Sequence, residues 1–271
     1  MSDAKPIHPA ATILLLRDGP RGLEVFMVVR HQEIGAFSGA LVFPGGKVDP
    51  EDAEAREVCR SSAGLSDAEL AFHVAAIREA FEECGVLLAR PSGMEETVDA
   101  SRLAGLEATY RQALARDELG IAEVCRREGL ELATDLLAPF AHWITPPAAP
   151  RRFDTHFYLA PAPGDQVALH DGEESTDSTW VRPADALDQA AQGRRTIVFP
   201  TQMNLRKLNS SRTVGEAIAS ASKKPVVTVS PTMEKHAQGR VLTIPEAAGY
   251  GGRRFLARQD GDLVLGVEAL D

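Results

Sequence analysis

The sequence predicts an α/β protein in which a mixed sheet lies between helices, with a helical subdomain inserted at about residues 92–140. Three observations support this fold. Short β-rich runs recur through the first half of the chain, one long amphipathic helix lies among them, and a helix-rich stretch separates them from a later alternating run. We expect residues 1–271 to form one elaborated domain.

The predicted strands are short and bounded by turn residues. The first two, at 11–16 and 25–29, are separated by Arg17-Asp18-Gly19-Pro20-Arg21-Gly22, which is typical of a hairpin. Further strands are expected at 40–43, 153–159 and 179–181, with weaker candidates at 167–169, 226–229, 241–244 and 255–257. Helices are expected at about 183–192 and in part of 200–221.

One helix is predicted from about residue 67 to residue 84. Its apolar positions recur every three or four residues, at Leu70, Val74, Ile77, Phe81 and Cys84. Ser66 and Glu69 have the spacing of a capping box, which predicts the start of the helix. Gly85 is a suitable residue to end it, because glycine adopts the left-handed conformation of a helix C-terminus without strain.

The stretch from 95 to 137 is predicted to be helical throughout. Gly120 and Gly129 break it into two or three helices. An extended connector of prolines and alanines follows at 146–150. We expect the inserted helices to form either a lid that sets specificity or the surface of a homodimer, since insertions beside a site commonly carry specificity.

Composition narrows the classes of function. Acidic residues outnumber basic ones by 39 to 29, so a nucleic-acid partner is not expected and a phosphate substrate would need a cation. No apolar run approaches the 18 to 20 residues that cross a bilayer, so no membrane partner is expected. Three cysteines without a C-x-x-C pair and the absence of a secretory signal favour the reducing cytoplasm. The seven histidines form no local metal-binding motif, so no zinc site is expected.

The segment with the clearest chemistry lies on the predicted helix. Glu79, Glu82 and Glu83 stand at i, i+3 and i+4 and therefore project from one face, where like charges repel. They also lie near the helix C-terminus, where the helix dipole disfavours anions. A bound divalent cation would remove this cost, and oxygen ligands favour Mg²⁺ or Mn²⁺ over zinc. The alternative is an ordinary solvated acidic face.

The residues upstream favour the cation. A β-rich run ends in Phe43-Pro44-Gly45-Gly46, and glycines allow the backbone to approach a ligand closely. Together these segments resemble the Nudix hydrolase family, whose box is G-x5-E-x7-R-E-U-x-E-E-x-G-U, with U apolar. The second half of the box matches without a gap at 78–86, and Gly46 matches its first glycine.

Two departures from the box concern its early carboxylate. Asp52 stands where the box has glutamate, and the spacer of seven residues is replaced by the 25 residues of 53–77. Glu51, Glu54 and Glu57 are therefore alternatives to Asp52 for this role.

The resemblance implies a fold, a cofactor and roles for matching residues. The expected fold is a Nudix-like αβα sandwich. Glu79, Glu82 and Glu83 would bind Mg²⁺ or Mn²⁺ on a diphosphate substrate, with the Gly45 carbonyl as a further candidate ligand. Arg78 would orient the glutamates through charge-assisted hydrogen bonds.

Further residues are candidates for roles in the reaction. The acidic segment before Trp180 resembles the loop from which the family often draws a general base, and Glu174 is preferred there, with Glu173 second. Arg30 ends a strand near the predicted site and is expected either to meet a substrate phosphate or to form a surface salt bridge. Arg152 is expected either to contact the substrate or to pair with Asp154.

The whole chain is similar to the branch of the family that includes acyl-coenzyme A diphosphatases. The similarity rests on 42–46, the long spacer, the helical insertion, 143–146, 151–155, and Pro200-Thr201 followed by Leu205 and Leu208. It implies a hydrolase of a nucleoside diphosphate linked to another moiety, with coenzyme A or acyl-coenzyme A as the leading substrate. The alternatives are a catalytically silent Nudix-fold binding or regulatory protein and, less well supported, an isomerase of prenyl diphosphates.

Overall fold

The structure is a computed structural model that describes residues 5–31, 39–172, 175–260 and 263–271. Its principal sheet has the strand order β10-β7-β8-β1-β2-β3, with β4 paired to β1 and β9 paired to β2. Its strands are β1 (Ile7–Gly19), β2 (Gly22–Arg30), β3 (Leu41–Val42), β4 (Gly45–Lys47), β7 (Ala138–Ile144), β8 (Arg152–Pro161), β9 (Ser175–Val181) and β10 (Thr228–Val229). The β1–β8 and β10–β7 pairs are parallel and the others antiparallel, so the predicted mixed sheet is confirmed.

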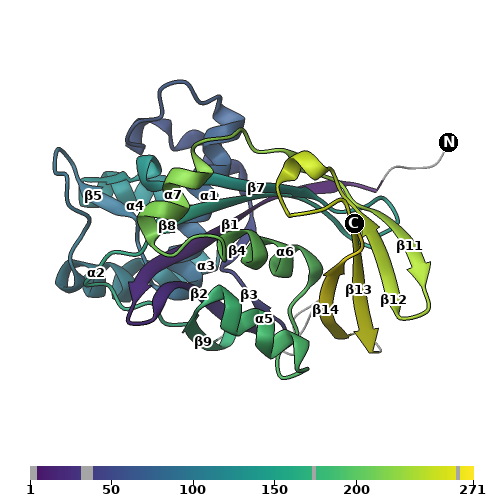
Figure 1. The fold of residues 1–271 in the computed structure, drawn as a ribbon. Coiled ribbons are helices and arrows are strands. Elements are labelled where there is room, and N and C mark those ends of the chain that lie inside the picture. Colours follow the sequence, from purple (N-terminus) through teal and green to yellow (C-terminus); the bar gives the residue numbers. More distant parts are fainter. Residues whose placement is uncertain (1–4, 32–38, 173–174, 261–262) are drawn as a thin grey trace.

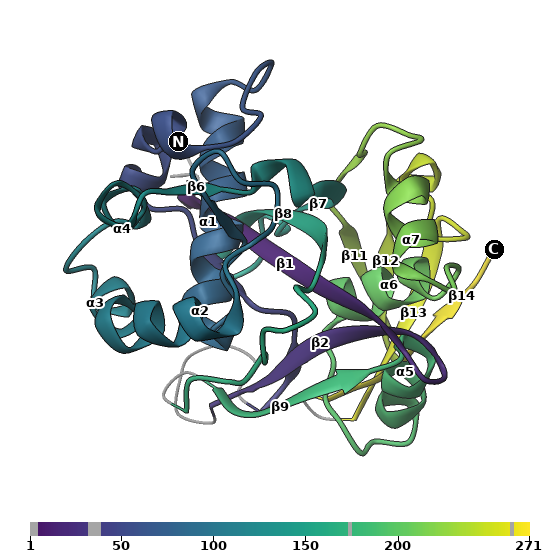
Figure 2. The same ribbon diagram turned by 90° about the vertical axis from the view of Figure 1, so that its left-hand side faces the viewer.

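Helices cover both faces of this sheet. The helices are α1 (Asp67–Cys84), α2 (Ala100–Leu106), α3 (Gln112–Ala115), α4 (Ile121–Glu128), α5 (Pro183–Ala191), α6 (Phe199–Leu208) and α7 (Val214–Ala221). Figures 1 and 2 show α1 to α4 on one side of the sheet and α5 to α7 on the other. Two apolar cores follow from this arrangement, because alternate residues of β1 enter opposite clusters: Ile13 and Leu15 pack with α1, whereas Leu14 and Leu16 pack with α6.

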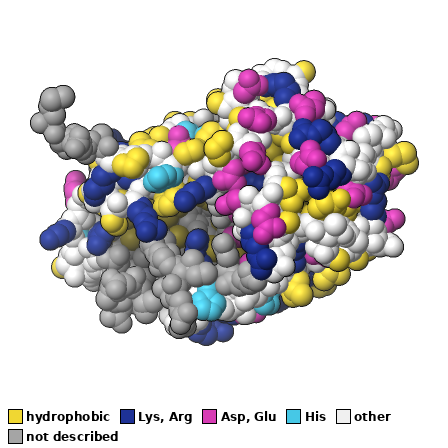
Figure 3. All heavy atoms as spheres, turned by 180° about the vertical axis from the view of Figure 1, so that it is seen from behind, with side chains coloured by type: hydrophobic (Ala, Val, Ile, Leu, Met, Phe, Trp, Pro, Cys, Tyr) yellow, Lys and Arg dark blue, Asp and Glu magenta, His cyan; other side chains and the backbone are white. Residues whose placement is uncertain are grey.

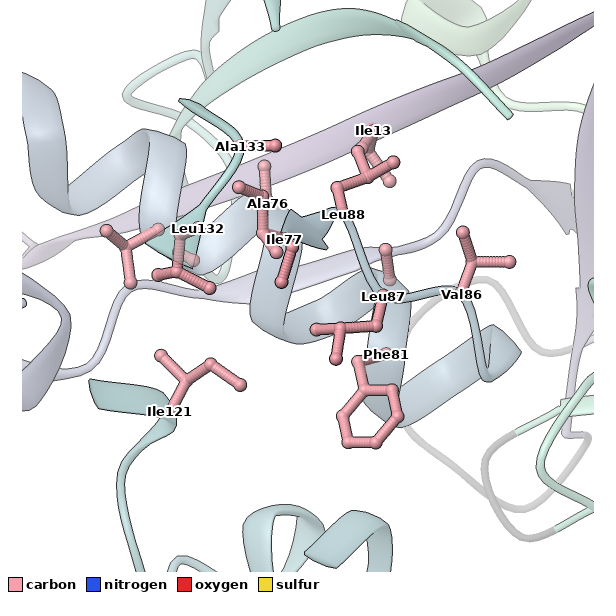
Figure 4. Close-up of a cluster of buried hydrophobic side chains, with 14 of the residues drawn as sticks. Ile13, Ala76, Ile77, Phe81, Val86, Leu87, Leu88, Ile121, Leu132 and Ala133 are labelled. Atoms are coloured by element: carbon pink, nitrogen blue, oxygen red, sulfur yellow. The ribbon is translucent and has the colours of Figure 1, made fainter. Parts of the chain in front are cut away.

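The helix that carries the candidate glutamates begins and ends as predicted. The Ser66 hydroxyl accepts a hydrogen bond from the Glu69 amide, and the Glu69 carboxylate accepts one from the Ser66 amide. Gly85 adopts a left-handed conformation with φ of 66° and ends the helix. The buried side of α1 is apolar, and Figure 4 shows Ile77 and Phe81 from this side in the same cluster as Ile121 from α4.

The insertion is not helical throughout, contrary to the prediction. Helix α2 continues through a π-helical turn (Glu107–Arg111) into α3, and α4 ends at Gly129 in a left-handed conformation. The chain then forms β6 (Leu130–Leu132), which pairs with β5 (Ala89–Pro91) and closes the base of the insertion. Alternating leucines at 130 and 132 are buried, so a period of two lies within the predicted helical region.

One other expectation about strands is wrong, and one strand was not expected. The weak candidate at 167–169 is not a strand: Val167 and Leu169 are 80% and 57% exposed, and neither has a partner strand in the described part of the chain. Strand β7 was not predicted, because Pro139 and the alanines near it are poor strand formers. Pro139 lies at an irregularity in the β7–β8 pairing, which is where sheets tolerate proline.

The C-terminal region forms a second, antiparallel sheet of the order β11-β12-β13-β14 in the described residues. Its strands are β11 (Thr232–His236), β12 (Gly239–Thr243), β13 (Arg254–Asp260) and β14 (Leu263–Ala269). The weak predictions at 241–244 and 255–257 fall on β12 and β13, whereas β11 and β14 were not predicted. Phe255 is fully buried in the core that also contains α6, so this sheet packs on the side of the principal sheet opposite α1.

None of the helices in the described part of the chain combines the length and the apolar character needed to cross a bilayer.

Candidate active site

The candidate site is built where the last two turns of α1 meet the short strand β4. Gly45 and Gly46 of β4 pair with Thr12 and Ala11 of β1, which fixes their position on the sheet. A Cβ atom at Gly45 would lie 2.3 Å from the Ala11 carbonyl oxygen, and one at Gly46 would lie 2.3 Å from Glu79 Oε1. Gly45, with φ of 153°, is therefore needed for the close approach to β1, and Gly46 leaves room for the Glu79 carboxylate beside the strand.

The three glutamates converge on this strand. Glu83 Oε2 accepts a hydrogen bond from the Gly45 amide at 2.9 Å. Glu79 lies against Gly46, and the side chains of Glu79 and Glu82 are 12% and 13% exposed. All three carboxylates are thus held in a largely buried position by α1 and β4.

Arg78 contacts most of the carboxylates in the site. Its guanidinium contacts four carboxylates, which are those of Asp49 (3.2 Å), Asp52 (3.0 Å), Glu79 (3.1 Å) and Glu82 (3.2 Å). It also donates to the Lys47 carbonyl oxygen at 2.7 Å. Burial disfavours the guanidinium charge, but the hydrogen bond and charge of Asp52, with the charges of the two glutamates, outweigh this and raise the pKa of Arg78.

Asp52, at the position of the early carboxylate of the box, forms an ion pair with Arg78 in the structure. Asp52 is 1% exposed and accepts two hydrogen bonds from Arg78, from Nε at 3.0 Å and from Nη2 at 3.1 Å. It also accepts a hydrogen bond from the Asp49 amide at 2.8 Å. The alternatives Glu51, Glu54 and Glu57 are exposed and line a different surface, next to Gly120. Asp52 is therefore the acid that holds Arg78.

Among the described residues of the site, carboxylates outnumber the basic side chains. Arg78 contacts four carboxylates, and Glu83 adds a fifth beside them. Burial raises the pKa of Glu82, as do the charges of Asp49 and Asp52, against the opposing effect of Arg78. An oxygen-rich, half-buried cluster with this excess of charge fits hard divalent cations such as Mg²⁺ or Mn²⁺. Figure 3 shows acidic side chains, interleaved with basic ones, on the half of the molecule that carries α1 to α4.

The insertion contributes a residue that sequence reasoning missed. Arg111, at the end of the π-helical turn, donates from Nε to the Glu82 carbonyl oxygen at 2.8 Å. It thereby supplies a cation and a hydrogen-bond donor at the C-terminus of α1, where carbonyl groups lack partners within the helix. No local motif marks Arg111, because it is 29 residues away from Glu82 in the sequence.

The loop that precedes β9 adjoins the same end of α1. The Leu169 amide donates to the Cys84 carbonyl oxygen at 3.0 Å, and the Asp171 carboxylate accepts from the Ser175 amide at 3.0 Å. The expected general base, Glu174, and its alternative, Glu173, lie outside the described residues. Their role stays a prediction.

The two candidate arginines outside α1 occupy different places. Arg30 is the last residue of β2 and is partly exposed, next to an irregularity in the pairing of β2 with β9. Arg152 begins β8 opposite Ile7 and donates to the Thr145 carbonyl oxygen at 3.1 Å. In the described residues no contact joins Arg152 to the glutamates.

The expected pairing of Arg152 with Asp154 is not formed. Asp154 contacts His142 and His156 instead. The histidines form no local motif in the sequence, but the fold brings two of them together with an acid: one ligand atom each from His142, Asp154 and His156 lies within 4.8 Å of the others. Residues 142 and 156 are brought together only by the pairing of β7 with β8.

Comparison with known proteins decides the family. A family model described as the NUDT19 Nudix domain matches residues 59–208, which is more than half of the chain. The chain belongs to the Nudix family. The crystal structure of a NUDIX hydrolase from Alicyclobacillus acidocaldarius is similar to this Nudix chain with a TM-score of 0.68 and 29% identity, and the match covers 82% of this chain and 99% of that chain. The predicted Nudix fold is thereby confirmed.

Curated relatives agree with this assignment. The Nudix chain is 28% identical over 200 residues to putative nudix hydrolase 7 of Caenorhabditis elegans, covering 74% of this chain and 60% of the relative. It is 29% identical over 229 residues to acyl-coenzyme A diphosphatase NUDT19 of Homo sapiens, covering 69% and 60%. The chain spans about 60% of the length of these relatives.

Proposed function

We propose that this Nudix chain is a metal-dependent hydrolase that cleaves the diphosphate bond of a nucleoside diphosphate linked to another moiety. The observation that carries the proposal is the convergence of Glu79, Glu82 and Glu83 on the Gly45–Gly46 strand around a single arginine. A protein that only bound a nucleotide would gain nothing from burying this excess of negative charge. The catalytically silent binding protein is therefore the less favoured alternative.

Each residue of the site has a distinct part in this proposal. Glu79, Glu82 and Glu83 would hold Mg²⁺ or Mn²⁺, with the Gly45 carbonyl as a further candidate ligand. The bound cation would neutralise the diphosphate, polarise its P–O bonds and lower the pKa of a bound water. Arg78 holds Glu79 and Glu82 in place, and Asp52 holds Arg78. Glu174 is proposed as the general base, because Leu169, five residues before it, contacts the end of α1, and Arg30 is proposed to meet a substrate phosphate.

Coenzyme A or acyl-coenzyme A is the proposed substrate class. The matching family model is that of the NUDT19 Nudix domain, and three curated relatives are named acyl-coenzyme A diphosphatases. The proposed location of the protein is the reducing cytoplasm, with which its three free cysteines are consistent. Whether the insertion acts as a lid or as a dimer surface stays a prediction.

The proposal is tested by a hydrolysis screen with Mg²⁺ or Mn²⁺ and with EDTA. The panel contains coenzyme A, an acyl-coenzyme A, ADP-ribose, NADH, a dinucleoside polyphosphate and deoxynucleoside triphosphates. Metal-dependent release of 4′-phosphopantetheine from coenzyme A supports both the reaction and the substrate. Cleavage of ADP-ribose or NADH alone keeps the reaction and overturns the substrate, and hydrolysis in ¹⁸O-water identifies the phosphorus attacked.

Variants then connect the activity to the site. We expect Glu82→Gln and Glu83→Gln each to lower kcat at least about 100-fold, because each removes a charged ligand for the cation. Glu54→Gln is the matched control, since this exposed glutamate lies outside the site. Near-normal turnover by either ligand variant, with an unchanged circular dichroism spectrum, would contradict the assignment. Metal binding by calorimetry without cleavage of any substrate in the panel would favour the binding-protein alternative.

A further inference from the structure

A second group of potential metal ligands lies on the α1 side of the principal sheet. His142 of β7 is directly opposite His156 of β8, and Asp154 projects from β8 on the same face, two residues before His156. One ligand atom from each residue lies within 4.8 Å of the others. His142 Nε2 contacts Asp154 Oδ1, and His156 Nε2 lies 3.9 Å from the same oxygen.

These separations are close to those of a metal-bound set. Ligands about 2.1 Å from a tetrahedral zinc ion lie roughly 3.4 Å from one another. Small side-chain rotations would therefore bring the three ligand atoms around one ion. The strands need not move, because the backbone pairing already places the three residues together.

The outer nitrogen of His142 has a partner that orients the ring. Its Nδ1 lies 2.8 Å from the Thr228 hydroxyl, and Thr228 is next to His142 in the parallel pairing of β10 with β7. Metal-binding histidines nearly always use their second ring nitrogen in this way, and the contact orients the ring. It leaves His142 Nε2 as the nitrogen that faces Asp154.

The ring of His156 is held in place by its neighbours. It stacks on Phe72 of α1, with centroids 4.1 Å apart, and lies 4.0 Å from the ring of His142. These contacts keep His156 beside the other two potential ligands, so the ring is positioned before any ion binds.

Space for an additional ligand adjoins the two histidines. A cavity of about 200 Å³ is lined by both histidines together with Glu69, His73 and Val226. A site with three protein ligands beside a cavity can keep an open position for water or a small anion. Glu69 and His73, which also line this cavity, are further potential ligands.

We propose that His142, Asp154 and His156 form a binding site for a divalent transition-metal ion, best suited to Zn²⁺. Two imidazoles and a carboxylate favour such an ion over Mg²⁺, whereas the glutamate cluster offers oxygen atoms only. The sites are separate, because Phe72, which stacks on His156, precedes Glu79 by seven residues, or roughly 10 Å along α1. A bound ion would join β7 to β8 and, through Thr228, would be supported by β10. The proposal does not depend on the hydrolysis proposed above.

The test is a zinc titration of the full chain after treatment with a chelator. An excess of Mg²⁺ is kept present so that the carboxylate site is filled, and a chromophoric chelator competes for Zn²⁺. We expect one tight zinc site in the wild type and in Glu82→Gln. We expect at least a tenfold loss of zinc affinity in His142→Ala, Asp154→Asn and His156→Ala, because each lacks one ligand. His236→Ala is the matched control, since this exposed histidine lies on β11, outside the cluster.

If a variant fails to fold, a spectroscopic measurement on the wild-type protein identifies the ligands of the zinc ion. X-ray absorption at the zinc edge of the wild-type protein should show scattering from two imidazoles, and the Thr228→Val variant should bind Zn²⁺ about tenfold more weakly. Zinc ligated by oxygen atoms alone would overturn the proposal. Zinc affinity that is lost in Glu82→Gln but retained in His142→Ala would do the same, because the ion would then belong to the glutamate cluster.

Discussion

At the scale of single residues, Asp52 shows how the site depends on a buried ion pair. Its carboxylate accepts two hydrogen bonds from Arg78, which in turn contacts Glu79 and Glu82. Planar pairing of this kind fixes the orientation of the guanidinium as well as its charge. Asp52 therefore controls where the two glutamates lie, although it has no described contact with Glu83 or Gly45.

We expect Asp52→Asn to lower the free energy of unfolding by about 1–2 kcal/mol, because it weakens two charge-assisted hydrogen bonds to Arg78, which keeps its contacts with Asp49, Glu79 and Glu82. Activity should fall as well, since Arg78 would be held less firmly. Urea denaturation and steady-state kinetics measure the two effects. Glu54→Gln is again the control and should change stability by less than about 0.5 kcal/mol. Equal effects of the two substitutions would show that Asp52 does not have this role.

Residue roles were predictable from the sequence only where they depend on local spacing. The shared face of Glu79, Glu82 and Glu83 follows from helical periodicity, so it could be predicted. The pairing of Asp52 with Arg78 spans 26 residues and a spacer of unusual length, so spacing left Glu51, Glu54 and Glu57 as alternatives. Only the fold, which buries Asp52 and leaves the others exposed, separates them.

At the scale of elements, the insertion supplies a hydrogen bond to the C-terminal turn of α1. Its N-terminus is capped by its own neighbours, Ser66 and Glu69, whereas its last turn is bound by Arg111. Arg111 also contacts Glu107 at 3.2 Å and the Leu169 carbonyl oxygen at 3.4 Å. The end of α1, the insertion and the loop before β9 therefore form one connected network.

We expect Arg111→Ala to lower kcat/KM about tenfold, because the last turn of α1 would lose both a hydrogen bond and a favourable charge. Hydrogen exchange at the amides of 82–85 should become faster at the same time. Arg127→Ala is the matched control, since Arg127 is exposed on α4 and pairs with Glu123. If kcat/KM and exchange in Arg111→Ala both equal those of the wild type, the insertion does not support the site.

Elements were predicted well where one signal dominated and poorly where signals competed. Helix α1 has a capping box, a regular apolar stripe and a terminal glycine, and all three indicate the same bounds. Strand β6 lies directly after α4 and is only three residues long, so its two alternating leucines form too short a pattern to stand out from the helix before them. Its partner β5 lies about forty residues earlier, and local patterns carry no information about that pairing.

At the scale of the whole molecule, stability is expected to depend on pH through His156. The folded protein lowers the pKa of this residue to about 4, from an ordinary value near 6.5. Between these values the unfolded chain binds more protons than the folded one, so stability falls as the pH decreases through this range. Because His156 is 30% exposed, we expect a contribution on the order of 1–2 kcal/mol.

The measurement is urea denaturation of the metal-free protein at pH 7 and pH 5, with His156→Gln for comparison. The groups around the ring, which are His142, Asp154, Glu69 and His73, are present in both proteins. The difference between the two pH profiles therefore isolates His156. The wild type should lose more stability on acidification than the variant does, and parallel profiles would contradict the expected pKa.

The pairing of the strands has a consequence for which insertions and deletions the protein can tolerate. Five residues on five strands lie in one row across the sheet: Thr228, His142, His156, Ala11 and Gly46. Because side chains alternate along a strand, removing one residue within β1 would turn its neighbours to the opposite face and shift the histidines relative to the glycines. Length changes should therefore be restricted to the loops, and the central strand should accept substitutions far more readily than gaps.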